Sequence, residues 1–204
     1  MFLSLTGTVT DAGELYNENQ DFINFHLKEF GMNIDEFKKD ISSVVSNTLS
    51  YLDKDHKKSW KLLHDLKSID DVKSLRQYAD KIEDEIGKFV DEFEEKKEMI
   101  GGVNFYYFEP ILNVKGPVSG IISHQDHDEA YIFVSPKDDE KYLSLSARNT
   151  SQKINMADML RAGIEGLEEG SAGGHIPAAG GMILAKDLDK FKQNVREFLE
   201  NYSK

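Results

Sequence analysis

The first hundred residues carry two apolar seams in which the spacing alternates between three and four residues. This 3.5-residue period places apolar side chains on one face of a helix, whereas a strand requires a period of two. Residues 18–100 are therefore predicted to be a helical hairpin packed antiparallel. Residues 51–68 form its connection, with a shorter helix around Trp60. Such seams would also support association with a partner or a second copy. Their members are Ile34, Phe37, Ile41, Val44, Thr48 and Tyr51, then Val72, Leu75, Ala79, Ile82, Ile86, Phe89, Phe93 and Ile100.

The pair Gly101-Gly102 is expected to end the second helix and to mark a domain boundary. After it, strand-like and helix-like segments alternate. This order predicts a mixed α/β (α+β) class, with a small mixed sheet and helices packed on it. The expected strands are residues 103–108, 131–134, 141–148 and 179–184, and the expected helices are residues 116–123, 155–167 and 187–202.

The N-terminal segment carries the apolar residues Phe2, Leu3, Leu5 and Val9. Residues 2–9 are predicted to be a strand, followed by a turn at residues 11–13. The chain is thus expected to divide into residues 1–17, 18–100 and 101–204.

Composition limits the classes of function. The net charge of −12 disfavours a dedicated nucleic-acid scaffold, because such binding draws mainly on Lys and Arg. It leaves room for a local site that binds one or two phosphates. The chain has no cysteine, which excludes disulfides and thiolate metal sites and fits a reducing cytoplasm. No apolar run is long enough to span a bilayer, so a cytoplasmic protein without membrane contact is expected.

The run from Gly173 to Gly181 is the strongest candidate for a binding site. Two glycines before a histidine allow amide groups to converge, and the small residues after it keep side-chain bulk away from a ligand. A loop of this kind suits an anion such as a phosphate, although a glycine-rich run can also be an ordinary turn. The candidate contacts are Gly173, Gly174, His175, Ala178, Ala179 and Gly180.

Arg148 is a second candidate for phosphate contact. It ends an expected strand, and its guanidinium offers a planar fork that matches phosphate oxygens. Ser144 and Ser146 precede it on that strand and are expected to face away from Leu143 and Leu145. One face of the strand would then be polar.

The segment His124-Gln125-Asp126-His127-Asp128-Glu129 is tempting as a metal site. Adjacent residues cannot all point at one ion without an unusual loop, so a solvated turn is the better interpretation.

Two stretches of the chain resemble DHH-family phosphoesterases. The order Gly-Gly-His-x-x-Ala-Ala-Gly at residues 173–180 resembles the signature of that family's C-terminal substrate-binding module, and residues 142–148 resemble its Ser/Arg-bearing strand. The resemblance extends from about Val103 to the C-terminus and is closest to RecJ-like single-strand-specific exonucleases of archaeal type. It implies that substrate is contacted by Arg148, Gly173, Gly174, His175, Ala178, Ala179 and Gly180.

A shorter match lies at residues 4–11, which resemble the family's last catalytic-domain motif, with Thr10 in place of a small Ala. In the family this motif is a strand whose Asp binds metal, so Asp11 is implied as a single remnant ligand. Residues 1–17 would be a remnant of the catalytic domain, 18–100 a connector and 101–204 the DHH-associated substrate-binding domain. The family's other metal-binding motifs do not occur in this sequence.

The resemblance implies manganese-dependent hydrolysis of phosphodiester bonds by an intact family member, from the 5′ end of single strands. This chain is expected to bind no metal alone and to serve as the part that binds single-stranded nucleic acid. Three alternatives stay open: an inactive replication or repair assembly factor, one half of a split enzyme whose catalytic half is a separate chain, and a fragment of an oligoribonucleotide or nucleoside-bisphosphate phosphatase. A truncated gene or a short paralogue would also give such a sequence.

Overall fold

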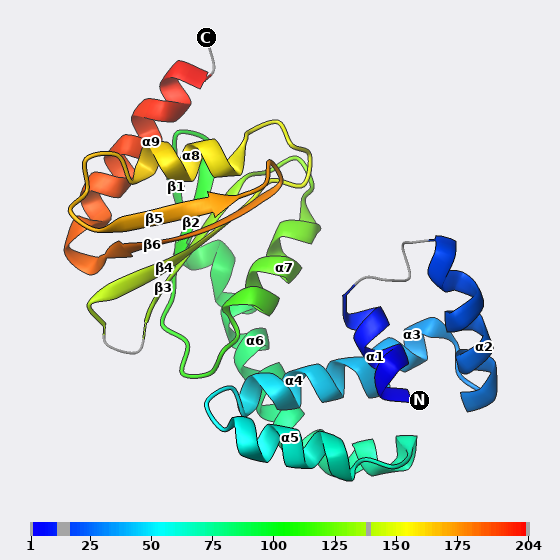
Figure 1. Ribbon diagram of the computed structural model, residues 1–204. Coiled ribbons are helices and arrows are strands. Elements are labelled where there is room, and N and C mark those ends of the chain that lie inside the picture. Colours follow the sequence, from blue (N-terminus) through cyan, green and yellow to red (C-terminus); the bar gives the residue numbers. More distant parts are fainter. Residues whose placement is uncertain (1, 12–16, 138–139, 203–204) are drawn as a thin grey trace. The chain divides into compact units, whose positions relative to one another are not determined.

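A computed structural model describes residues 2–11, 17–137 and 140–202 (Figure 1). The chain forms two compact units, Met1–Glu85 and Ile86–Lys204. No helix of the described residues is both long and apolar enough to cross a membrane.

The first unit is helical. It begins with α1 (Phe2–Thr10), so the prediction of a strand at residues 2–9 is wrong. The buried residues of α1 are Phe2, Leu5, Thr6 and Val9, which is the i, i+3, i+4, i+7 spacing of one helix face. The Thr6 hydroxyl donates to the carbonyl of Phe2 at 3.0 Å, so the helix accommodates this β-branched residue. Of the turn expected at residues 11–13, residues 12 and 13 lie outside the described residues.

Further helices complete this unit, the last of which continues into the second unit, and the predicted short helix around Trp60 is confirmed as α5. The elements are η2 (Asn17–Asn19), α2 (Gln20–Phe30), α3 (Ile34–Phe37), the π-helical η3 (Lys38–Ser42), α4 (Ser43–Tyr51), α5 (His56–Asp65), η4 (Ile69–Leu75) and α6 (Arg76–Lys96).

Both predicted seams are helical, but the second is divided between two cores. Its first part packs on the first seam, where the Thr48 hydroxyl lies 3.4 Å from the carbonyl of Leu75. Its later part belongs to the second unit, where the ring of Phe93 lies 5.3 Å from that of Tyr106. The predicted hairpin packing therefore holds only for the first part of the second seam.

Helix α6 ends at Lys96, and the prediction of helix up to residue 100 is wrong. The segment β1 (Glu98–Ile100) is a strand that pairs antiparallel with β2 (Val103–Tyr107). The two glycines between them have φ angles of 58° and 90°, as a tight hairpin turn requires. Ile100 therefore continues the seam in sequence but is buried in the core beneath the sheet.

The second unit confirms the predicted mixed α/β class. Its six-stranded sheet has the order β1-β2-β3-β4-β6-β5, in which only the β2–β3 pair is parallel. The remaining strands are β3 (Tyr131–Pro136), β4 (Tyr142–Arg148), β5 (Gly170–Gly174) and β6 (Ala178–Leu184). The helices are α7 (Lys115–Gln125), α8 (Met156–Gly163), η5 (Ala185–Asp187) and α9 (Leu188–Tyr202).

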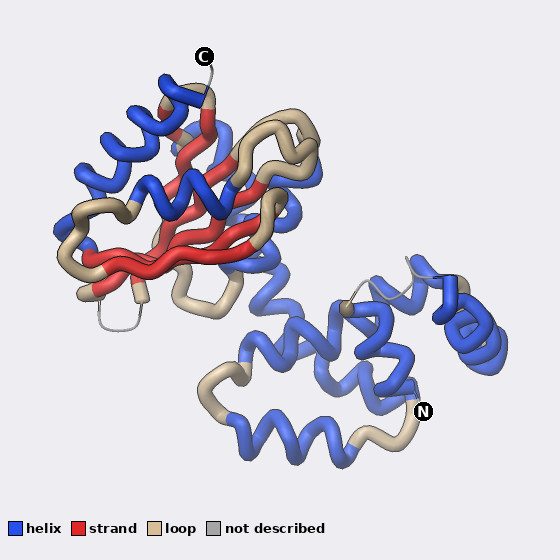
Figure 2. Tube along the Cα trace, turned by 45° about the horizontal axis from the view of Figure 1, so that its top comes forward, coloured by secondary structure: helices blue, strands red, loops and turns tan. Residues whose placement is uncertain are grey.

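Helices cover the sheet unequally on its two faces. Helices α8 and α9 pack on one face over a continuous apolar core that includes Ile132, Leu145 and Phe191 (Figure 2). On the other face, α7 contacts β3 and β4, and Phe93 of α6 packs on Tyr106 and Phe133. Strands β6 and β5 thus have well-packed helices on one side only, which bears on the site described next.

Candidate functional site

Strand β4 presents a polar face and an apolar face, as predicted. Leu143 and Leu145 are buried in the core under α8 and α9. Ser144, Ser146 and Arg148 alternate with them and therefore point to the other face.

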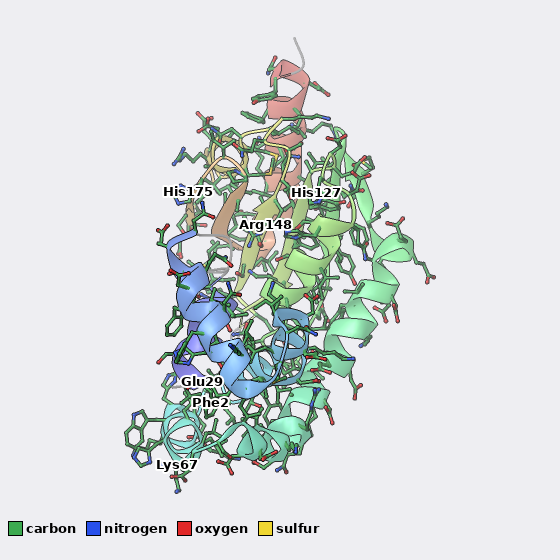
Figure 3. The ribbon with its side chains drawn as sticks, turned by 90° about the vertical axis from the view of Figure 1, so that its right-hand side faces the viewer. Phe2, Glu29, Lys67, His127, Arg148 and His175 are labelled. Atoms are coloured by element: carbon green, nitrogen blue, oxygen red, sulfur yellow. The ribbon has the colours of Figure 1, made fainter. Side chains whose placement is uncertain are left out.

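The strand register places these side chains in three rows across the sheet. Arg148 pairs with Ala178 of β6, and Ala178 in turn faces His175 across the turn of the β5–β6 hairpin. Ser146 pairs with Gly180, which pairs with Gly173. The third row consists of Ser144, Met182 and Ser171. Continued alternation along the hairpin directs the His175 side chain to the same face as Arg148. Both residues are labelled in Figure 3.

The glycine-rich run is a β-hairpin rather than an open loop. The amide of His175 donates to the carbonyl of Ala178 at 2.8 Å, and the amide of Ala178 donates back at 3.2 Å. The expectation that the loop amides converge freely on an anion is wrong for these two N–H groups, because each donates to the carbonyl of the other residue. The carbonyls of Ile176 and Pro177 accept hydrogen bonds from Met156 and Asn149, so the tip is anchored at the start of α8 and the end of β4.

The glycines of this hairpin fall into two kinds. Gly174 has a φ of 143°, and a Cβ on Gly181 would lie 2.8 Å from the carbonyl oxygen of Ser171, so packing and conformation exclude side chains there. A Cβ on Gly173 would meet nothing within 4 Å, and one on Gly180 would meet only the Leu145 carbonyl oxygen at 3.7 Å. Both of these glycines are exposed on the polar face. Packing does not require glycine at either position, and both glycines leave the backbone exposed.

The structure brings together most, but not all, of the predicted contacts. Arg148, His175, Ala178, Gly173 and Gly180 share the polar face. Ala179 lies on the opposite face, buried in the core, and Gly174 pairs with it. These two residues therefore shape the hairpin and place no side chain at the site.

Three cations surround the polar face. The ammonium group of Lys115, in the first turn of α7, donates a hydrogen bond to the Ser144 hydroxyl. Lys137 lies 3.8 Å from the sulfur of Met182, which is the register partner of Ser144. Arg148 is half-buried and donates to the carbonyl of Ala147 at 2.9 Å. Within the described part of the chain, none of the three forms an ion pair with a carboxylate.

Burial without a counter-ion lowers the pKa values of two of these cations, Lys115 and Arg148. Burial, and then repulsion from Arg148 and Lys137, lower the pKa of Lys115 to about 8. Burial also lowers the pKa of Arg148, whose guanidinium nonetheless stays protonated at neutral pH. Half-buried cations without acidic partners are costly, and an anionic ligand would remove that cost.

Sequence reasoning missed Lys115 and Lys137. Each lies at the end of a local element, and only the fold brings them to the face that carries Ser144. No local motif marks either lysine.

The predicted metal ligand does not fit a metal site. Asp11 is exposed and follows the end of helix α1, instead of lying on a strand. Among the residues that the structure describes, no three His, Cys, Asp or Glu side chains are grouped as a metal ion would require. The residues present therefore do not support manganese binding at Asp11.

The structure agrees with the interpretation of the acidic and histidine-rich segment at residues 124–129 as a solvated turn. Residues 124–128 are exposed at the end of α7 and beyond it. The rings of His124 and His127 meet edge to face at 5.8 Å, and Asp128 binds Lys153 at 2.9 Å.

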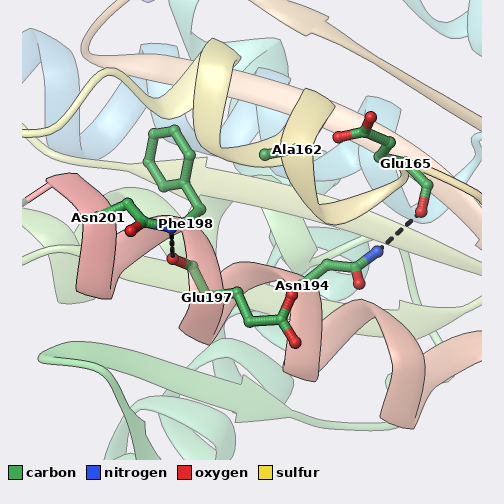
Figure 4. Close-up of a pocket in the computed structure, with 6 residues that line it drawn as sticks. All are labelled: Ala162, Glu165, Asn194, Glu197, Phe198 and Asn201. Carbon is green, nitrogen blue, oxygen red and sulfur yellow. Dashed lines mark hydrogen bonds between the residues drawn. The ribbon is translucent and has the colours of Figure 1, made fainter.

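A hollow of about 400 Å³ lies between α8 and α9, away from the polar face (Figure 4). Its polar lining is satisfied locally: Asn194 donates to the carbonyl of Glu165 at 2.9 Å, and Asn201 to that of Glu197 at 2.9 Å. The carboxylates of Glu165 and Glu197 disfavour an anionic ligand there. We therefore place the candidate site on the polar face.

Comparisons with known proteins identify a match in the second unit. Residues 113–201 match the family described as the DHHA1 domain, and they include Lys115, Arg148 and His175. This part of the chain is therefore similar to the DHHA1 domain, in agreement with the resemblance seen in the sequence. A search of curated proteins found no match.

Several solved structures are similar in fold. RecJ from Thermus thermophilus in complex with Mg²⁺ is 17% identical with a TM-score of 0.72, over 98% of this chain and 34% of that one. Exonuclease RecJ bound to manganese is 17% identical with a TM-score of 0.67, over 97% and 54% of the two chains. A DHH domain from a member of a family of ribosomal proteins is 14% identical with a TM-score of 0.64, over 96% and 49%. The chain thus spans about a third to a half of these proteins.

Proposed function

We propose that the polar face of the sheet binds the phosphate backbone of single-stranded nucleic acid, and that this chain is the nucleic-acid-binding portion of a RecJ-like DHH phosphoesterase. The observation that carries the proposal is the grouping of Lys115, Lys137 and Arg148 without a carboxylate partner, around exposed glycines. The chain has a net charge of −12, and this group of cations makes the polar face a local site that attracts an anion.

The rows of the sheet give each residue a role. Arg148 offers two parallel N–H donors to one phosphate, with His175 as a further polar contact two strands away. Gly180 and Gly173 let the strand approach the backbone closely. Lys115 and Ser144 lie at the other end of β4, about 13 Å along the strand from Arg148, which leaves room for more than one phosphate.

Binding and positioning are the whole of the proposed role for this chain. Hydrolysis of a phosphodiester needs a held water and stabilisation of phosphate oxygens, which a metal supplies in many such enzymes. The described residues provide no such centre. Any hydrolysis would therefore require groups beyond those described here.

The test is the affinity of the full chain for a fluorescent single-stranded oligonucleotide, measured by anisotropy. The Arg148→Ala variant should bind about 10- to 100-fold more weakly, because one charge-assisted contact to phosphate is lost. Its dependence of log affinity on log salt should become shallower by about 0.7. The matched control is Arg161→Ala, since Arg161 is exposed on α8 and paired with Asp158 at 2.9 Å. Equal affinities of the Arg148 variant and the wild type would refute the proposal.

A further inference from the structure

The outer face of helix α5 carries an unusual combination of side chains. Trp60, the single tryptophan of the chain, is 69% exposed. The inner face of the same helix holds Leu62 and Leu63, which pack against the core of the first unit. The indole is therefore not required to anchor the helix.

The Trp60 ring is held in place by a second ring. His64 lies one helical turn further on and stacks on Trp60, with ring centroids 5.1 Å apart and planes 20° from parallel. His64 also lies 3.3 Å from Asp65 through its Nδ1 atom. A large exposed ring that is held by a stacked neighbour is a preformed flat surface.

Positive charge surrounds this ring. Lys57 lies one turn before Trp60 and Lys61 directly follows it, both exposed. Lys61 binds Asp65 at 2.6 Å, whereas Lys57 forms no ion pair within the described chain. The helix HKKSWKLLHD thus holds three lysines against one aspartate, with the carboxylate of Asp55 as its N-cap. This local excess stands out against the chain's net charge of −12.

We propose that the outer face of α5 is a second contact for single-stranded nucleic acid, in which a base stacks on Trp60 and Lys57 and Lys61 bind the flanking phosphates. Stacking on an aromatic ring beside cations is the usual way in which proteins hold unpaired bases. A partner helix or a lipid surface would need a wider apolar patch, and the residues around Trp60 on this face are charged or polar. The contact lies in the helical unit and does not depend on the Arg148 site.

The test uses the emission of Trp60, which reports on this helix alone because the chain has no other tryptophan. Titration of the full chain with an unlabelled oligothymidylate should quench the emission saturably, and less at high salt. An abasic strand of equal length should bind without comparable quenching. Quenching should persist in the Arg148→Ala variant, which separates this contact from the sheet face.

Variants complete the test by anisotropy with a labelled strand. Trp60→Leu should bind about 5- to 150-fold more weakly, the range expected when one base loses its stacking partner, and Trp60→Phe should recover part of the loss. Lys57→Gln should also lower the affinity for the strand. Lys58→Gln is its matched control and should not, because the Lys58 ammonium lies over the ring of Tyr78 at 5.0 Å. Unchanged Trp60 emission at saturating strand, equal quenching by the abasic strand, or wild-type affinity of Trp60→Leu would each overturn the proposal.

Discussion

Replacing Gly180 by valine should affect the stability of the fold and the affinity for the ligand in opposite directions. Gly180 lies within β6 on the exposed polar face, and a Cβ there would approach only the Leu145 carbonyl oxygen, at 3.7 Å. Glycine within a strand costs roughly 0.5–1 kcal/mol of stability relative to a residue with a side chain. Gly180→Val should therefore raise the free energy of unfolding by about that amount and the melting temperature by about 2–8 °C.

The same substitution should weaken binding. The valine side chain would stand between Ser146 and Gly173, where we expect the strand to approach the backbone. Displacing a phosphate from Arg148 by the width of a side chain removes a contact of about 1.5–3 kcal/mol, so affinity should fall at least about tenfold. Thermal unfolding and oligonucleotide anisotropy on the same preparation measure both effects.

Gly181→Ala is the matched control, one residue along the same strand. Its methyl group would lie 2.8 Å from the Ser171 carbonyl oxygen and 3.3 Å from Leu145. This substitution should cost about 1–3 kcal/mol through overpacking. If Gly180→Val bound oligonucleotide as well as the wild type while remaining folded, the open backbone would have no part in binding, and our interpretation of these glycines would be refuted.

Three further predictions concern the second unit. Affinity for a phosphodiester should fall by up to about tenfold per pH unit as the pH rises above 8, since Lys115 loses its proton there, and anisotropy at pH 6.5–9.5 should show no such fall for Lys115→Met. Gly163→Ala should destabilise this unit by about 1–3 kcal/mol in chemical unfolding, because its Cβ would lie 2.5 Å from the Phe191 ring; a loss below 0.5 kcal/mol would contradict this packing. Asn155→Ala should cost about 1 kcal/mol, because the Asn155 side chain accepts hydrogen bonds from the first turn of α8, and Asn155→Asp should retain most of it.

The sequence predicted the second unit well because its signals are local. Strands β2, β3 and β4 each follow a turn or glycine signal, and their apolar residues are buried together. Helix α8 was predicted to run to residue 167 but ends at Gly163. Gly166 has a φ of 70°, a conformation that a continuing helix does not allow.

The prediction of secondary structure failed at two segments where the sequence is compatible with both a helix and a strand. The segment at α1 is rich in β-branched residues, which favours a strand, yet Phe2, Leu5 and Val9 follow the helical period that the core selects. Similarly, Ile100 extended an apolar period across β1, although the glycine pair after it requires a hairpin. In both places burial against distant residues decided between two locally acceptable structures.

The candidate site was predictable only in part. Arg148 and His175 were found because strand alternation and a short motif identify them. Lys115 and Lys137 reach the same face from separate elements, and only the sheet register shows this. The pairing of the His175 and Ala178 amides also depends on the hairpin rather than on glycine content.

The unpaired cations around β4 belong to a chain whose overall charge repels their proposed ligand. At physiological ionic strength charges are screened beyond about 8 Å. An approaching polyanion therefore feels both the repulsion of the chain's net charge of −12 and the attraction of the local cations only at short range. Lowering the salt would strengthen the final contact but extend the repulsive field that slows approach. The association rate should then rise with ionic strength while the residence time of the bound strand falls. The strand would exchange fastest at high salt and be held longest at low salt.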